Sequence, residues 1–136
     1  MTRTTNRFLD GFIDGYMDAL AWSGTVSVPE DHPQFDEGCD PTADRIDEPF
    51  APSFLAQCRA DCIDFLSDEV MAILEANDEV WDPGRAGHDF WLTRNGHGCG
   101  YWDRGAGDAG ETLSAAARVY GSVDLYLGDD NLIYGS

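Results

Sequence analysis

The side chains best suited to chemistry lie in one stretch, residues 88–104, which reads HDFWLTRNGHGCGYWDR. The candidates for acid–base catalysis in it are His88, Asp89, His97 and Asp103. Imidazole and carboxylate groups are the usual proton carriers of enzymes. No nucleophile elbow, phosphate-binding loop, HExxH motif or zinc-deaminase signature accompanies them. The sequence therefore predicts no catalytic residues and a protein that is not an enzyme, with a small hydrolase as a minor alternative.

The cysteines form a second group that could do chemistry. They are Cys39, Cys58, Cys62 and Cys99, and their spacing matches no tight zinc pattern such as C-x2-C. Cys58 and Cys62 stand four residues apart in a predicted helix, in phase with Leu55 and Leu66. This phase predicts buried thiols that act as small hydrophobic groups. We expect no metal and no cofactor, and a four-cysteine metal site is the alternative.

The elements that position the 88–104 stretch are predicted to be β-strands. Residues 89–94 are rich in strand formers, and Asn95-Gly96 is the strongest two-residue hairpin turn. The resulting register places Trp91 opposite Gly100 and Phe90 opposite Tyr101. A glycine across from a tryptophan lets the indole lie over bare backbone, so we interpret the glycines as packing devices first and a ligand-approach site second.

The same stretch carries a resemblance. The residues GHDFWLTRNGHGCGYWDRG and, near the end, GDDNLIY resemble a family of small acidic proteins encoded by bacteriophages and other mobile elements. The likeness covers residues 88–134 well and the first half loosely, through ALAWS at residues 19–23 and the pair Asp61-Cys62. The chain departs from the family at Cys99 and Asn131. The family has no settled activity, so the resemblance implies a phage or mobile-element protein working inside a bacterium and no catalytic residues.

Two amphipathic segments are predicted in the first half. Residues 7–22 place seven apolar side chains on one half of a helix and Asp10, Asp14 and Asp18 on the other. Residues 53–78 form a second helical region, with a possible break where Ser67 could cap a new helix. If that region is continuous, eight acids from residue 61 to residue 82 span about 32 Å, one per roughly 4 Å. This spacing is close to the roughly 3.4 Å of a single DNA strand.

The remaining segments complete a predicted α+β fold in a single domain, residues 1–136. Residues 25–50 are expected to be a long acidic loop. Residues 111–120 are expected to form a short helix, and residues 123–127 and 131–134 a second hairpin. The fold class is therefore α+β: a four-stranded antiparallel sheet from two C-terminal hairpins with a helix between them, and the N-terminal acidic helices, in residues 1–82, packed on it.

The charge of the chain is strongly negative and unevenly distributed. The 26 acidic residues and 8 arginines leave a net charge of −18, and there is no lysine. Residues 1–82 hold 19 acids and 4 arginines, a net −15, whereas residues 83–136 hold 7 acids and 4 arginines, a net −3. Such acidity excludes nucleic acid and anionic membranes as direct partners. Adaptation to a salty cytoplasm is the alternative explanation of this acidity. Such adaptation should place acidic residues over the whole surface, so the asymmetry between the two parts of the chain favours a localised function.

These observations favour a binding protein. We expect a DNA mimic whose carboxylates replace phosphates and occupy the groove of a host nucleic-acid-binding protein, such as a restriction enzyme, a CRISPR effector or a uracil-DNA glycosylase. The alternative is a phage adaptor that binds a host protein through an aromatic sheet face. No apolar run approaches the roughly 18 residues of a membrane span and no signal peptide is evident, so we expect a cytoplasmic protein. The residues predicted to bind the partner are Asp10, Asp14, Asp18, Asp36, Glu37, Asp61, Asp64, Asp68, Glu75, Asp78 and Glu79.

Overall fold

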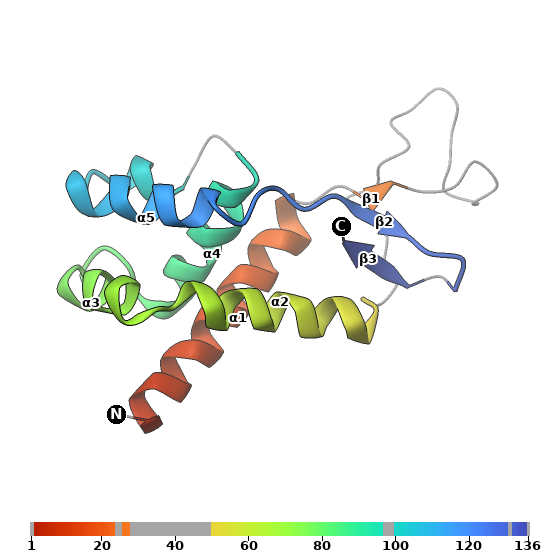
Figure 1. Ribbon diagram of the computed structural model, residues 1–136, viewed down its shortest axis with the longest axis horizontal. Coiled ribbons are helices and arrows are strands. Elements are labelled where there is room, and N and C mark those ends of the chain that lie inside the picture. The colour runs from red at the N-terminus through yellow and green to blue at the C-terminus, as the bar shows by residue number, and fades with distance from the viewer. Residues whose placement is uncertain (1, 24–25, 28–49, 97–99, 131, 136) are drawn as a thin grey trace.

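The computed structural model describes residues 2–23, 26–27, 50–96, 100–130 and 132–135. Helices fill most of the molecule, and a small sheet lies at one end of it (Figure 1). In chain order the elements are α1 (Thr2–Ser23), β1 (Val26–Ser27), α2 (Pro52–Phe65), α3 (Asp68–Ala76), α4 (Pro83–Arg94), the 3-10 helix η1 (Tyr101–Arg104), α5 (Asp108–Arg118), β2 (Leu125–Leu127) and β3 (Ile133–Gly135).

The prediction of a four-stranded antiparallel sheet built from two hairpins is wrong. The described residues form five α-helices and a sheet with one antiparallel strand pair, β2 with β3. The two-residue strand β1 joins β2 in parallel, so the strand order is β1-β2-β3. The C-terminal hairpin itself is confirmed, with Tyr126 opposite Tyr134 and Leu127 opposite Ile133. The predicted helix over residues 111–120 is also confirmed, as α5.

The segment predicted as the central hairpin is the helix α4. Asp82 caps its N-terminus by accepting a hydrogen bond from the Arg85 amide at 2.8 Å, and Pro83 occupies the first turn, where a missing amide costs nothing. Asn95 and Gly96 end the helix instead of turning a hairpin. Gly96 has φ +71, the left-handed conformation that favours glycine after a helix. Tyr101, which the predicted register places opposite Phe90 on a returning strand, begins η1 instead, and residues 97–99 lie outside the described part of the chain.

The reason for this error is that α4 is buried on nearly all sides. Eight of its twelve residues are buried, including both Phe90 and Trp91, which point in different directions around the helix. A helix surrounded by protein has no polar face, so its sequence lacks the 3.6-residue periodicity that identifies an amphipathic helix. Short apolar runs of this kind are ambiguous between strand and helix. Gly100 is still a packing device, because a Cβ there would overlap the side chains of Thr93 and Trp102.

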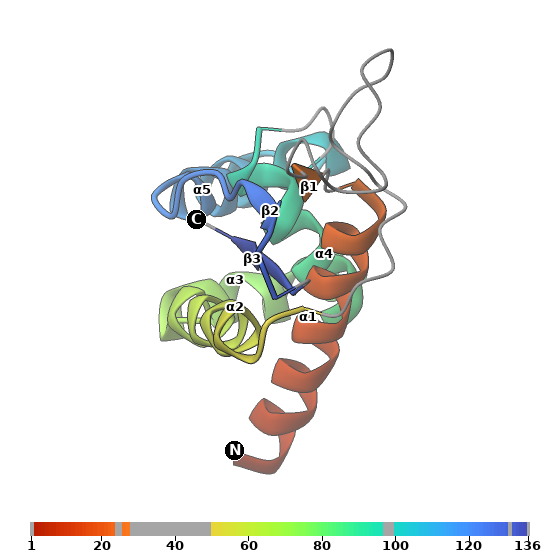
Figure 2. The ribbon, with the colours of Figure 1, turned by 90° about the vertical axis from the view of Figure 1, so that its right-hand side faces the viewer.

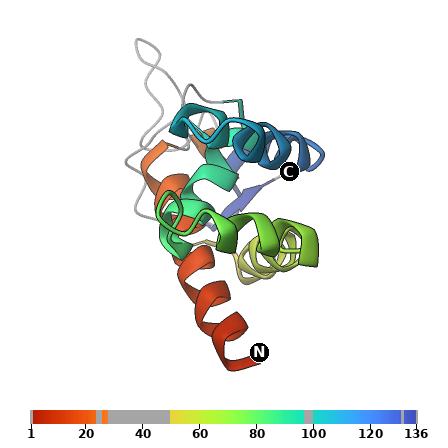
Figure 3. The same ribbon diagram turned by 90° about the vertical axis from the view of Figure 1, so that its left-hand side faces the viewer.

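Helices α1 and α4 cross at very close range, and glycines permit the contact. A Cβ at Gly15 would overlap the Gly84 carbonyl, and one at Gly87 would overlap the Phe12 carbonyl. The contact at Gly15 is therefore between backbones, and Gly11 lies against the Pro83 ring. The apolar face predicted for α1 is confirmed as well, since Phe12, Tyr16 and Leu20 are buried. The first turns of α1 extend past the other elements (Figures 2 and 3).

The second helical region is two helices, and the possible break at Ser67 is confirmed. The Ser67 hydroxyl accepts a hydrogen bond from the Val70 amide at 3.2 Å, which caps α3. The buried stripe was partly misplaced: Leu55 is 42% exposed, whereas Phe54 and Phe65 are buried beside Cys58 and Cys62. A continuous helical row of acids from residue 61 to residue 82 is therefore wrong, because the helix breaks at Ser67 and α3 ends at Ala76.

The predicted loop over residues 25–50 lies almost entirely outside the described residues. Of that range, the structure describes three residues: Val26 and Ser27, which form β1, and Phe50, which forms an isolated β-bridge with Ile133.

The core between the helices is aromatic. The rings of Phe65 and Phe90 stack at 4.1 Å between centroids, and Tyr16 lies edge-on to Trp91 at 5.4 Å.

Candidate functional site

The guanidinium of Arg94 is buried in the middle of the molecule and joins four segments of the chain. It donates to Tyr16 Oη at 3.0 Å and to Asp61 Oδ2 at 2.9 Å. It also donates to the carbonyls of Tyr120 and Gly121, at 2.9 and 2.8 Å. Burial opposes the charge of Arg94, but Tyr16 and Asp61 outweigh it and raise the pKa of Arg94. This cation therefore has a structural role. A buried charge is strongly unfavourable when it is unpaired, and Arg94 is both paired and hydrogen-bonded.

A second buried ion pair centres on Asp89, one of the acid–base candidates. Its carboxylate is fully buried and accepts two hydrogen bonds from Arg104, at 2.6 and 2.8 Å. The indole of Trp81 donates a third at 2.9 Å, and His88 Nδ1 lies 3.6 Å away. A carboxylate held by a bidentate arginine and an indole has no open side for a substrate. Asp89 is thus a structural group, and Asp103, another candidate, is exposed.

The predicted partner-binding acids divide into four groups. Asp10, Asp14 and Asp18 are exposed along α1. Asp61 pairs with Arg94 and its side chain is only 20% exposed, so it is not part of an open acidic surface. Asp36 and Glu37 lie outside the described residues. We call the remaining exposed acids the α2–α3 acidic surface: Asp64, Asp68, Glu75, Asp78 and Glu79.

The α2–α3 acidic surface carries almost no compensating positive charge. Within the described part of the chain, none of its five carboxylates forms an ion pair. Asp64 accepts a hydrogen bond from Tyr120 Oη at 2.6 Å. Burial and this hydrogen bond together raise the pKa of Tyr120, so the phenol stays protonated and donates to the carboxylate. Asp68 lies in the first turn of α3, where the helix dipole favours an anion.

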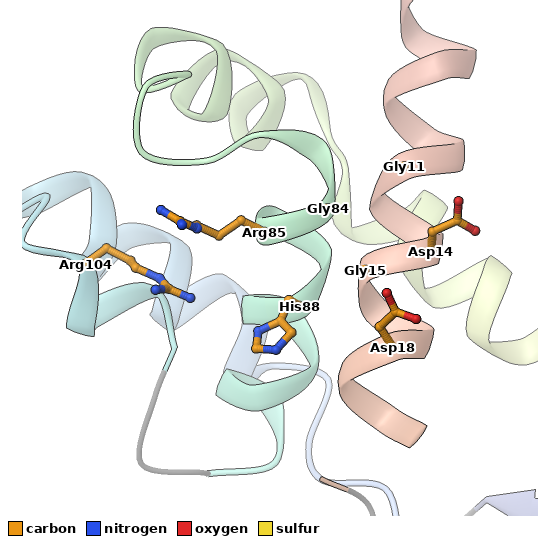
Figure 4. Close-up of a pocket in the computed structure, with 8 residues that line it drawn as sticks. All are labelled: Gly11, Asp14, Gly15, Asp18, Gly84, Arg85, His88 and Arg104. Atoms are coloured by element: carbon orange, nitrogen blue, oxygen red, sulfur yellow. The ribbon is translucent and has the colours of Figure 1, made fainter. Parts of the chain in front are cut away.

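A charged cleft of about 380 Å³ lies beside the crossing of α1 and α4. Figure 4 shows two carboxylates on α1 at one side and three nitrogen-bearing side chains, from α4 and η1, at the other. Gly11, Gly15 and Gly84 lie between them, where α1 packs against α4. The residues that line the cleft are Gly11, Asp14, Gly15, Asp18, Gly84, Arg85, His88 and Arg104.

The two described cysteines are buried, as predicted, and they lie on α2 next to Asp61 and Arg94. Burial, reinforced by the nearby Asp61 charge, raises the pKa of Cys58 to about 12. Burial also raises the pKa of Cys62. Both groups are therefore thiols at neutral pH, and thiolates are the form that attacks or binds metal. The described residues contain no cluster of three or more His, Cys, Asp or Glu suited to a metal ion, while Cys39 and Cys99 lie outside them.

The sequence pattern did not identify the two residues that organise the interior, Arg94 and Arg104. Both belong to the stretch with the most aromatic residues, and an arginine inside an apolar segment was the available signal. An arginine there must either reach solvent or meet a carboxylate, because burying it unpaired is very costly. Its partner could not be read from the sequence, since Asp61 is 33 residues away from Arg94.

Comparisons with known proteins find no match: no family model, no curated protein and no solved structure resembles the chain. The likeness to small acidic phage proteins therefore stays a prediction. None of the helices in the described ranges is both long enough and apolar enough to cross a membrane.

Proposed function

We propose that the protein binds a host nucleic-acid-binding protein by DNA mimicry and inhibits it, with the α2–α3 acidic surface as the main contact. The target class is a restriction, CRISPR or DNA-repair component in the cytoplasm of a bacterial host. The mimicry requires carboxylates that stay charged, stay exposed and are not neutralised by the protein's own cations. A basic groove that normally holds phosphates would then accept them in place of nucleic acid.

One observation carries this proposal: the five acids of the α2–α3 acidic surface form no ion pair with a described residue, while two described arginines are bound to carboxylates inside the fold. Arg94 and Arg104 are bound to the partly buried Asp61 and the buried Asp89, and Arg118 lies over the Trp102 ring at 5.5 Å. The five acids of the α2–α3 acidic surface have no such partner among the described residues. An ordinary solvated helix face mixes acids with bases three or four residues apart. The absence of lysine removes that usual compensation.

The second candidate function is that of an adaptor that binds a host protein through an aromatic face of the sheet, and one observation favours it. Tyr126 and Tyr134 stack at 5.6 Å between centroids on the sheet, and Tyr126 is 41% exposed. Exposed aromatic side chains are common at protein interfaces. Binding through this pair would depend weakly on salt, whereas binding through carboxylates would weaken steeply as salt rises.

The test uses two variants with equal net charge. In the first, Glu75→Gln, Asp78→Asn and Glu79→Gln neutralise three exposed acids of the α2–α3 acidic surface. In the matched control, Glu111→Gln, Asp124→Asn and Asp129→Asn neutralise three exposed acids of the C-terminal part. Each triple change raises the net charge by three units. Asp61 is left intact in both, because its loss would leave the buried Arg94 charge uncompensated.

The measurement is capture of proteins from a bacterial lysate, followed by elution with duplex DNA at two salt concentrations. We expect the parent and the control variant to retain a DNA-binding protein that duplex DNA and high salt both release. The α2–α3 variant should retain at least about tenfold less, because charge-assisted contacts are worth about 1.5 to 3 kcal/mol each. Equal retention by the two variants, or a captured protein that DNA does not release, would show that mimicry is wrong. Salt-independent binding lost on Tyr126→Ala would establish the adaptor instead.

A further inference from the structure

A smaller cavity, of about 180 Å³, lies where the buried Arg94 guanidinium meets α2 and the chain that follows α5. Helix α2 contributes Phe54, Gln57, Cys58 and Asp61 to its lining, and Tyr16, Arg94, three residues that follow α5 and the end of β3 complete it. We call this cavity the Arg94 pocket. At about 30 Å³ for each water that such a space holds, it suits a ligand of roughly six non-hydrogen atoms.

The Tyr16 hydroxyl is a buried donor without an acceptor. Tyr16 is 1% exposed, and its Oη accepts a hydrogen bond from Arg94 Nη1 at 3.0 Å. Burial raises the pKa of Tyr16 despite the nearby Arg94 charge, so the phenol keeps its proton at neutral pH. Among the residues that the structure describes, none accepts that proton. A buried hydroxyl proton without a partner is unfavourable, so this group is suited to donate to a ligand in the pocket.

Arg94 supplies a further donor. A guanidinium carries five N–H groups. The described residues offer it four acceptors: Tyr16 Oη, Asp61 Oδ2 and the carbonyls of Tyr120 and Gly121. One N–H of Arg94 therefore lacks an acceptor in the described part of the chain. Because Tyr16 Oη and the guanidinium are in contact, one carbonyl oxygen with its two lone pairs can accept from both.

The charges of the pocket favour a neutral ligand. Arg94 and Asp61 are paired with each other at 2.9 Å, and burial raises the pKa of Cys58 to about 12, so that thiol is uncharged. The described lining holds no second cation to bind an anion, and the net charge of −18 opposes the approach of one. An ammonium group has no lone pair to offer the two donors.

The other lining residues define the rest of the ligand. Asp61 accepts from Arg94 at Oδ2 and from Gln57 at Oδ1, and each carboxylate oxygen has another lone pair that can accept from a ligand N–H. Phe54 is 6% exposed and Val123 is half-buried, and both present apolar surface. A matching ligand therefore combines a carbonyl oxygen, an N–H group and a short aliphatic group.

We propose that the Arg94 pocket binds a small aliphatic primary amide. Its carbonyl oxygen accepts from Tyr16 and Arg94, its amino group donates to Asp61, and its aliphatic group packs against Phe54 and Val123. This site is separate from the surface proposed for DNA mimicry, because none of the five acids of the α2–α3 acidic surface lines the pocket.

The test compares three probes of nearly the same shape. Isobutyramide carries the carbonyl and the amino group, isobutyrate carries an anion in their place, and isobutylammonium carries a cation with no acceptor. Each is titrated into the full chain at constant ionic strength, up to about 50 mM, which detects millimolar dissociation constants. Backbone-amide NMR shifts report affinity and location. We expect isobutyramide to shift residues 54–61 and 120–123 and to bind at least about fivefold more tightly than either charged probe, since one hydrogen bond is worth about that factor.

Two pairs of matched variants locate the ligand. Val123→Phe places a ring in the pocket and should abolish the isobutyramide shifts, whereas Val119→Phe, at an 82% exposed position outside the pocket, should leave them unchanged. Tyr16→Phe removes one donor and should weaken isobutyramide binding about fivefold. Tyr126→Phe removes an exposed phenol that does not line the pocket, and should have no effect. The melting temperature of each variant shows that it is folded during the titration, and the comparison of the three probes on the parent chain needs no variant.

Several results would overturn the proposal. Isobutyramide that causes no shifts would mean that the pocket holds water alone, and shifts confined to other residues would place the ligand elsewhere. Equal or tighter binding of isobutyrate or isobutylammonium at residues 54–61 would contradict selection of a neutral amide. Unchanged isobutyramide binding by folded Val123→Phe or Tyr16→Phe would contradict the site. The variant with Glu75, Asp78 and Glu79 as amides should bind isobutyramide like the parent, so failure of this proposal and failure of DNA mimicry are distinguishable.

Discussion

At the scale of single residues, burial separates structural carboxylates from available ones. Asp89 and Asp61 are held by arginines, whereas Asp14, Asp18 and the α2–α3 acidic surface face solvent. A buried ion pair costs desolvation and is repaid only when its geometry is close to ideal. The bidentate contact of Arg104 with Asp89, completed by the Trp81 indole, meets that condition.

The first prediction concerns this ion pair. Asp89→Asn keeps the size of the side chain but leaves the Arg104 charge without its partner. We expect it to lower the free energy of unfolding by about 3 kcal/mol, because breaking one side of a buried pair has that cost. The control is Asp103→Asn, an exposed carboxylate on η1, which should change stability by less than about 0.5 kcal/mol. Urea unfolding at neutral pH measures both, and equal stability of the two variants would show that the pair contributes nothing.

At the scale of elements, the α1–α4 crossing sets both the core and the cleft. The helices approach backbone to backbone at Gly15 and Gly87, so Phe12 and Tyr16 reach Phe90 and Trp91. The same approach brings Asp14 and Asp18 into one cleft with Arg85 and His88. A wider crossing would loosen the aromatic contacts and move the two sides of the cleft apart.

The second prediction tests that crossing with three alanine substitutions. Gly15→Ala and Gly87→Ala each force a methyl group into the backbone of the facing helix, and we expect a loss of about 2 kcal/mol or more from overpacking. Gly84→Ala is the matched control on α4. Its methyl group has room, and alanine favours a helix over glycine by up to about 1 kcal/mol, so stability should stay equal or rise. Thermal unfolding distinguishes them, and three equal melting temperatures would contradict the close crossing.

At the scale of the whole molecule, the net charge of −18 opposes folding through self-repulsion. The buried pairs of Arg94 and Arg104 are protected from solvent, so salt screens them weakly, whereas the exposed acids are screened fully. The sum of these effects predicts a protein that is more stable at high salt than at low salt.

The third prediction follows from that screening. Between about 0.01 M and about 1 M sodium chloride the Debye length falls from about 30 Å to about 3 Å. We expect the free energy of unfolding to rise by about 1 kcal/mol or more over that range, with a higher melting temperature. The variant with Glu75, Asp78 and Glu79 as amides should show a smaller rise, because part of the repulsion is already gone. A melting temperature that falls with salt would mean that surface ion pairs outweigh the repulsion.

Local features of the sequence were enough to predict the elements at the two ends of the chain. Helix α1 has one apolar and one acidic face. Because one face stays in contact with water, its apolar residues recur with the 3.6-residue period that identifies an amphipathic helix. The C-terminal hairpin and the α5 helix were also predicted from the sequence alone, and both are present. Burial of Cys58 and Cys62 and the break at Ser67 also followed from spacing and capping alone.

The centre of the molecule was decided by tertiary structure. Residues 83–94 are a helix buried on nearly all sides, so no pattern of polar and apolar residues marked its period. The pairs Arg94–Asp61 and Arg104–Asp89 join different elements, and the cleft requires residues from α1, α4 and η1. A sequence lists the charges but does not state which of them meet, because a pairing between distant residues depends on how the helices pack. The chain by itself determined how acidic its surface is, and the packing determined which acids remain on it.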